Sequence, residues 1–350
     1  MEAKREALAA RLSTANTFEL LAREWYESQK ARWKQVHADD VIGSLERDIF
    51  PDLGPLPVAS IDAPLVLATL RKVQERGAIE TSHRLRQRIS AVFAYGIATG
   101  RATSDPAASL GKALKPKPAG KRWPAVTRID DAREVLRLTD LAQASPTTVL
   151  ASRLLAITGQ RPGMIRWLRW DELHNLDLTG KGECSDAIWW VPAAKVKQEL
   201  ELRENDQFDH PVPLVQAAVE VLRASYCMNS ESIYAFPGAR SMLRPISENA
   251  LSYLYLREGL RGRQVPHGWR ATFSSLMNEW ALENGQERDR LVIDLMLAHR
   301  PTGVSATELK YNRAAFLKRR RELSEIWTGI LMEGAPAARD LLEGRRRRKH

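Results

Sequence analysis

Cysteine is nearly absent from this sequence of 350 residues. Only Cys184 and Cys227 occur, and their spacing fits neither a disulfide framework nor a zinc cluster, so a reducing compartment suits the chain best. Long apolar runs are also missing: no stretch approaches the roughly 20 apolar residues that cross a bilayer, and the N-terminus lacks the apolar core of a signal peptide. We therefore expect a cytoplasmic protein without a membrane partner.

Basic residues outnumber acidic ones. Lysine and arginine total 53 against 43 acidic residues, which gives a formal net charge of +10. Such a balance favours association with a polyanion such as nucleic acid, although many basic proteins bind none. The length suits two domains of unequal size.

Helical periodicity runs through residues 16–111, after an N-terminal linker-like segment at 1–15. Asn16 is the expected N-cap of the first helix, and Asp62 and Gly77 are expected to begin and end the third. The fourth helix has a polar side with His83, Arg84, Arg86 and Arg88. This face could follow DNA phosphates, although a solvated charged face is the commoner meaning of such a run.

The chain changes character after residue 111. Residues 112–124 (KALKPKPAGKRWP) are rich in Lys, Pro and Gly, which predicts an extended basic interdomain linker. Residues 125–335 form the second domain, with two short β-type runs at 187–192 and 210–214 among helices. Residues 336–350 form a basic tail. The expected fold is mainly α with a small β-sheet: a helical N-terminal domain and a mixed α/β second domain.

Four segments of the second domain carry residues suited to phosphate chemistry. A guanidinium can hold two phosphate oxygens while staying charged, His and Arg three residues apart share a helix face, and a phenol can attack phosphorus and later leave. Each feature alone is a weak signal, because an Arg-Pro-Gly turn or a lone helical tyrosine is more often structural. The segments are LLAITGQRPGMIRWLRWDEL with Arg161, IWWVPAAKVKQELELRENDQFDHPVPL with Lys197, HGWRATFSSLMNEW with His267 and Arg270, and LMLAHRPTGVSATELKYNRAAF with His299 and Tyr311.

In order and in type, these segments resemble the catalytic boxes of the tyrosine recombinase (phage integrase) family, particularly integrases of prophages, satellite phages and genomic islands. The resemblance spans about Thr147 to Trp327. It implies a helical core DNA-binding domain followed by a catalytic domain, and strand exchange on double-stranded DNA by a tetramer, with accessory DNA-bending proteins as candidate partners. Integration or excision of a mobile element is the implied biological reaction.

The resemblance also implies a role for each matched residue. Arg161 and Arg270 would brace the nonbridging phosphate oxygens, and His299 would add a hydrogen bond to the same phosphate. His267 would accept the proton of Tyr311, the nucleophile. Lys197 would protonate the leaving 5′ oxygen. No metal or cofactor is expected, since the two histidines lack acidic or cysteine companions.

Several points stay open at this level. Lys195, two residues before Lys197 on the expected strand face, is a rival proton donor. Met164 stands where the family usually has an acidic residue, so either another carboxylate, such as Asp171 or Glu172, holds Arg161, or activity is reduced.

Questions of function and of chain organisation also stay open. The alternatives in function are a type IB topoisomerase and a catalytically silent DNA-binding relative. Related integrases often carry a further N-terminal domain, so the chain is either a fragment or a shorter member. The amphipathic helix after Ala314 could dock on a neighbouring protomer or pack on its own domain.

Overall fold

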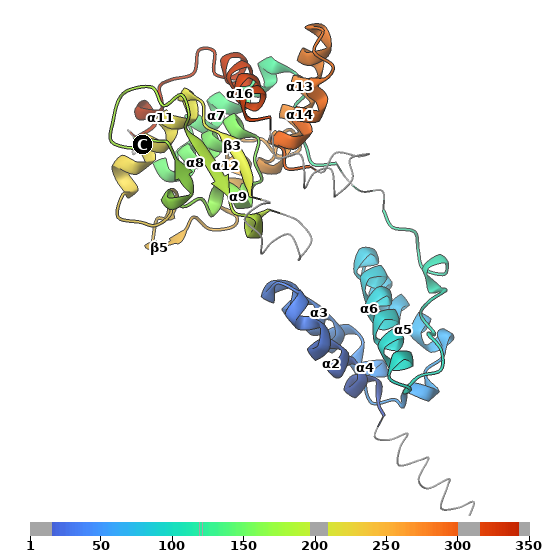
Figure 1. The fold of residues 1–350 in the computed structure, drawn as a ribbon. Coiled ribbons are helices and arrows are strands. Elements are labelled where there is room, and N and C mark those ends of the chain that lie inside the picture. Colours follow the sequence, from blue (N-terminus) through green and yellow to red (C-terminus); the bar gives the residue numbers. More distant parts are fainter. Residues whose placement is uncertain (1–15, 119, 121, 197–208, 300–315, 343–350) are drawn as a thin grey trace, which may run out of the picture. The chain divides into compact units, whose positions relative to one another are not determined.

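The computed structural model describes residues 16–118, 120, 122–196, 209–299 and 316–342. The chain divides into two compact units, Met1–Lys121 and Arg122–His350 (Figure 1). Each unit has its own cluster of buried apolar side chains.

Amphipathic helices build the first unit around one core. Asp62 caps the third long helix, its Oδ1 accepting a hydrogen bond from the Leu65 amide at 3.0 Å, and Gly77 follows that helix with a φ of +87°, as predicted. The first helix is capped by Thr17 rather than Asn16, because the Asn16 amide is used in a bond to the Arg101 carbonyl oxygen at 3.0 Å. The helices are α2 (Phe18–Gln29), α3 (Gln35–Asp48), α4 (Phe50–Leu53), α5 (Ala63–Glu75) and α6 (Ile79–Ala98), with 3₁₀ turns η1 (Lys30–Arg32), η2 (Val58–Ser60) and η3 (Leu110–Lys112).

Polar contacts tie α6 to the rest of the first unit. Arg88 donates to Ser44 and pairs with Asp40 at 2.6 Å, so it is anchored to α3. Arg86 donates to the Ala107 carbonyl oxygen at 3.1 Å. These two members of the predicted phosphate-facing side of α6 therefore brace the unit internally.

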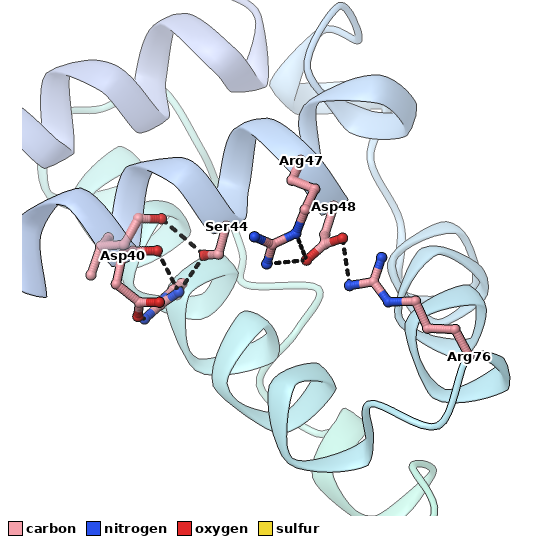
Figure 2. A network of polar contacts seen from close by, with 7 residues as sticks. Asp40, Ser44, Arg47, Asp48 and Arg76 are labelled. Carbon is pink, nitrogen blue, oxygen red and sulfur yellow. Dashed lines mark hydrogen bonds and ion pairs between the residues drawn. The ribbon is translucent and has the colours of Figure 1, made fainter. Parts of the chain in front are cut away.

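A second cluster of charges lies at the end of α3. Figure 2 shows the Asp48 carboxylate between Arg47 and Arg76, with pairs of 3.0 and 2.6 Å. The Asp48 side chain is only 1% exposed. Arg76 thereby joins the end of α5 to the end of α3.

The second unit is organised around α8. All residues of this helix from Thr148 to Thr158 are buried, and a helix that is buried on every side belongs in the interior of a domain. The helices of the unit are α7 (Ile129–Asp140), α8 (Pro146–Thr158), α9 (Pro162–Arg166), α11 (Gln216–Asn229), α12 (Ala250–Arg257), α13 (Trp269–Glu283), α14 (Asp289–Met296) and α16 (Leu317–Leu331). The unit also contains the 3₁₀ turns η4 (Trp170–Glu172), η5 (Ala193–Lys195), η7 (Pro266–Gly268) and η8 (Ala338–Leu342).

Two small antiparallel sheets complete the second unit. The first has the order β1-β2-β3, with Trp189 of β2 opposite Val212 of β3. The predicted strands at 187–192 and 210–214 are thus confirmed, as is the mainly helical fold with a small sheet. The strands are β1 (Leu173–His174), β2 (Ile188–Val191) and β3 (His210–Pro213) in one sheet, and β4 (Pro237–Gly238) and β5 (Ser241–Pro245) in the other.

The helix after Ala314 packs on its own unit. Trp327 of α16 is fully buried and its Nε1 donates to the Ala156 carbonyl oxygen of α8 at 3.0 Å. The Pro336 carbonyl oxygen beyond α16 accepts a hydrogen bond from Arg153, whose guanidinium also pairs with buried Asp140. Of the two alternatives for this helix, the structure shows packing within the chain.

Candidate active site

Four of the six predicted catalytic residues lie in the described part of the second unit. Arg161 is the N-cap of α9, directly after α8. His267 lies in η7, and Arg270 lies in the first turn of α13. His299 follows α14. Lys197 and Tyr311 fall outside the described residues.

A left-handed glycine lets the chain turn from α8 to Arg161. Gly159 has a φ of +61°, and a Cβ atom added there would lie 3.3 Å from Cγ of Phe273 on α13. The helix therefore ends close against α13. This approach puts the Gly159 carbonyl oxygen within 3.4 Å of Arg270 Nη1.

Arg270 is held by backbone carbonyl oxygens and by a predicted catalytic histidine. Arg270 is only 6% exposed, and its Nη2 lies 2.5 Å from the Leu297 carbonyl oxygen. The same Nη2 lies 2.8 Å from His299 Nε2. The fold thus brings together two residues that are 29 positions apart in the sequence.

Arg161 and Arg270 place two like charges in one partly buried site. Burial first, and then the charge of Arg161, lower the pKa of Arg270 to about 9. Burial also lowers the pKa of Arg161. Arg161 Nη1 is buried without a hydrogen-bond partner among the described residues. Guanidiniums that are desolvated and mutually repelled favour the binding of an anion.

The carboxylates proposed to replace the acidic residue at position 164 lie elsewhere. Asp171 pairs with Arg169 at 2.7 Å. Glu172 accepts from Trp189 Nε1 at 3.0 Å and pairs with a lysine. Met164 itself is buried in the apolar core, at 1% exposure. The expectation that Asp171 or Glu172 holds Arg161 is wrong, because both carboxylates are already bound to other groups.

Lys195 is the lysine that pairs with Glu172. It lies in η5 rather than on a strand, since β2 ends at Val191. Its Nζ also donates to the Trp167 carbonyl oxygen at 2.5 Å. The prediction that Lys195 lies on the strand face is therefore wrong, and its ammonium group is bonded to Glu172 and to the Trp167 carbonyl oxygen.

Trp123, inside the predicted linker, packs against a predicted catalytic residue. Its ring centroid lies 5.6 Å from that of His267. Its neighbour Pro124 accepts a hydrogen bond from the Val265 amide at 3.3 Å. A Cβ atom at Gly268 would lie 2.2 Å from the Pro124 carbonyl oxygen, so this contact requires glycine. The sequence offered one signal for Trp123, an aromatic residue in an otherwise basic, proline-rich segment.

His210 on β3 also supports the site and was missed by sequence reasoning. It is buried, and its Nε2 lies 3.2 Å from the Met296 carbonyl oxygen at the end of α14. Gln160 Nε2 donates to the same oxygen at 2.8 Å. Burial holds the pKa of His210 well below its ordinary value, so the ring stays neutral. These bonds fix the end of α14, from which His299 extends.

Among the described residues, no group of three or more His, Cys, Asp or Glu side chains is arranged to hold a metal ion. Within the same residues, no helix combines the length and apolar character needed to span a bilayer.

Known proteins resemble this chain over most of its length. Residues 18–113 match the model of the phage integrase central domain. Prophage integrase IntZ of Escherichia coli (strain K12) is 32% identical over 325 residues, which cover 93% of this chain and 73% of that protein. The chain therefore belongs to the phage integrase family, and the resemblance inferred from the four segments is confirmed.

Solved structures agree with this assignment at the level of the fold. A lambda integrase dimer bound to a COC′ core site has a TM-score of 0.61 and 16% identity, over 88% of this chain and 81% of that chain. A lambda integrase tetramer bound to a Holliday junction has the same TM-score and identity, over 85% and 82%. The mainly helical fold is thus that of an integrase.

Proposed function

We propose that this protein is a site-specific recombinase that cleaves and rejoins double-stranded DNA through a 3′-phosphotyrosine bond. Integration or excision of a mobile element is the reaction that this chemistry serves in an integrase. The observation that carries the proposal is the pair Arg161 and Arg270. Burial lowers the pKa of both, and among the described residues neither guanidinium forms an ion pair with a carboxylate.

The two guanidiniums have the chemistry to stabilise a phosphoryl transition state. Charge builds on the nonbridging oxygens as phosphorus becomes pentacoordinate, and fixed donors in a desolvated site stabilise that charge. Arg270 is oriented before substrate arrives, because carbonyl oxygens of two different segments hold it. Arg161 Nη1 has no hydrogen-bond partner among the described residues, so it can donate to a phosphate oxygen.

The remaining roles complete the reaction. Tyr311 attacks phosphorus, and His267 accepts its proton, since an imidazole titrates near neutral pH. His299 donates a hydrogen bond to the phosphate. Lys197 protonates the leaving 5′ oxygen. The bond energy is kept in the phosphotyrosine, so religation needs no nucleotide cofactor.

We assign the two units different tasks in this proposal. The first unit is the core DNA-binding domain and the second is the catalytic domain, with both binding one duplex through phosphates. The lambda integrase tetramer on a Holliday junction supports assembly of this chain as a tetramer on DNA. Accessory DNA-bending proteins would assist that assembly.

The direct test is a covalent trapping experiment. The full-length protein is incubated with duplexes that carry a nick next to the cleavage site, in buffer with EDTA, and separated by denaturing electrophoresis. We expect a covalent adduct whose proteolytic peptide contains Tyr311. Binding without an adduct would instead identify a silent DNA-binding relative, and relaxation of supercoils without recombinant products would identify a topoisomerase.

Removing Lys197 is expected to affect the cleavage rate, and removing Lys195 is expected to affect stability. Lys197→Ala should slow cleavage on the order of 10²-fold, the loss of a general acid, and a substrate with sulfur as the bridging 5′ atom should restore the rate because a thiolate leaves without a proton. Lys195→Ala should lower the melting temperature, since it leaves the carboxylate of Glu172 buried without its cation. Rapid-quench cleavage of both substrates measures these rates. If the sulfur substrate restored the rate of Lys195→Ala, Lys195 would be the general acid instead of Lys197.

A further inference from the structure

His299 is folded back over the last turn of α14. Ala298, just before it, has a φ of +50°, and the His299 amide donates to the Asp294 carbonyl oxygen at 3.0 Å. This turn brings the two edges of the imidazole to different groups. His299 Nδ1 lies 3.5 Å from Asp294 Oδ1, and Nε2 lies 2.8 Å from Arg270 Nη2.

The contact with Arg270 decides where the imidazole proton lies. A guanidinium has five N–H donors and no acceptor. His299 Nε2 must therefore accept the hydrogen bond from Arg270 Nη2, which leaves the proton of the neutral ring on Nδ1. The described group that Nδ1 faces is the Asp294 carboxylate.

We propose that Asp294 is a positioning residue that holds the Nδ1 proton of His299 and thereby keeps Nε2 directed at the phosphate-binding arginines. A carboxylate behind a histidine fixes both its tautomer and its ring orientation. The tautomer follows from the contacts alone. The consequence for DNA cleavage rests on the proposed function.

The charges around His299 explain how its role changes when a phosphate binds. The described ionisable groups facing the ring are Arg270 from α13, Arg161 from the start of α9 and Asp294 from α14. Burial first, and then the charge of Arg270, lower the pKa of His299, while Asp294 raises it. A phosphate between the arginines offsets their charge. The ring can then take a proton from solvent on Nε2 and donate it to a phosphate oxygen, while Nδ1 still donates to Asp294.

Stability is not the useful readout for this pair. The His299 and Asp294 side chains are 46% and 38% exposed, and half-exposed pairs contribute little to folding. The tautomer can be measured directly by ¹H–¹⁵N correlation spectra of the full-length protein with ¹⁵N-labelled histidine. The His299 signals are assigned by their loss in His299→Asn.

In the wild-type protein we expect a protonated Nδ1 and an Nε2 with a free lone pair. Asp294→Ala should move both nitrogen shifts toward those of an imidazole that exchanges between tautomers. Asp294→Asn should lower the pH midpoint of His299, because the negative charge that favours the imidazolium is removed. Glu287→Ala, an exposed carboxylate just before α14, should change none of these signals. A wild-type ring protonated on Nε2, or unchanged shifts in Asp294→Ala, would overturn the proposal.

The effect of Asp294 on DNA cleavage is measured with the covalent trapping assay. Asp294→Ala should slow adduct formation roughly 10-fold or more, the usual cost of losing a group that orients a functional histidine, with an altered pH profile and recovery in Asp294→Glu. An unchanged rate and pH profile would contradict a role in cleavage. If the wild-type protein forms no adduct, the proposed function fails, whereas the tautomer measurement still tests Asp294.

Discussion

Replacing Tyr311 with Phe is expected to abolish the covalent adduct while DNA affinity stays within about twofold of the wild-type value. The substitution removes one hydroxyl group and keeps the ring, so only the nucleophilic oxygen is lost. Covalent trapping on nicked duplexes measures the first quantity, and a gel-shift titration at fixed salt measures the second, because affinity for DNA depends on salt.

Two tyrosines of α12 provide the controls for this experiment. Tyr255 is buried and its hydroxyl group contacts Ser152 and Trp269, while burial raises its pKa to about 12. It is therefore a poor nucleophile that DNA cannot reach. Tyr253 is 59% exposed, so Tyr253→Phe is the matched control and should cleave normally. An adduct that survives in Tyr311→Phe and disappears in Tyr253→Phe would move the nucleophile to α12.

Loss of either arginine of the site should slow cleavage on the order of 10³-fold or more, as expected for a guanidinium that stabilises a phosphoryl transition state. Arg161→Gln is the cleaner variant, because Arg270 also satisfies carbonyl oxygens of the fold. Arg169→Gln removes the same charge from the same stretch of chain, but its side chain is 44% exposed and paired with Asp171. We expect near-normal cleavage in this control. Single-turnover rates within about threefold of wild type in Arg161→Gln would refute the role of Arg161.

The same arginines predict an effect that needs no DNA. Sulfate or phosphate should raise the melting temperature of the wild-type protein by about 2–4 °C at several times its Kd, since such binding contributes about 1 kcal/mol. Arg161→Gln should lose this site-specific part and keep the general salt effect, which Arg169→Gln also shows. Equal shifts in all three proteins would mean that the arginines hold no anion.

Local signals in the sequence predicted much of the fold. The helices of the first unit follow from apolar spacing, and the cap at Asp62 follows from a short side chain placed before a proline. Strand β2 was readable because β-branched and aromatic residues are concentrated in it. Asn16 was misassigned because Thr17, next to it, is also a favoured cap residue.

The candidate site was predictable in its residues and not in its contacts. The His-x-x-Arg and Arg-Pro-Gly motifs can be recognised in the sequence. The carbonyl oxygens that bind Arg270, however, belong to residues 111 and 27 positions away. The role of Lys195 depends on where β2 ends. Asp294 carried no signal at all, since an acidic residue on the polar side of an amphipathic helix is ordinary until the chain folds back on it.

Packing of residues 338–341 bears on how the proposed tetramer would assemble. Ala338 and Leu341 of η8 are buried with α16 in the core of the second unit, although both residues fall in the predicted basic tail. Exchanging this end between protomers would require breaking the bonds of Trp327 and Arg153 and exposing apolar surface to water. In the proposed tetramer, contacts among protomers would therefore be made more readily by surfaces that the folded monomer already presents, since association would then not begin with local unfolding.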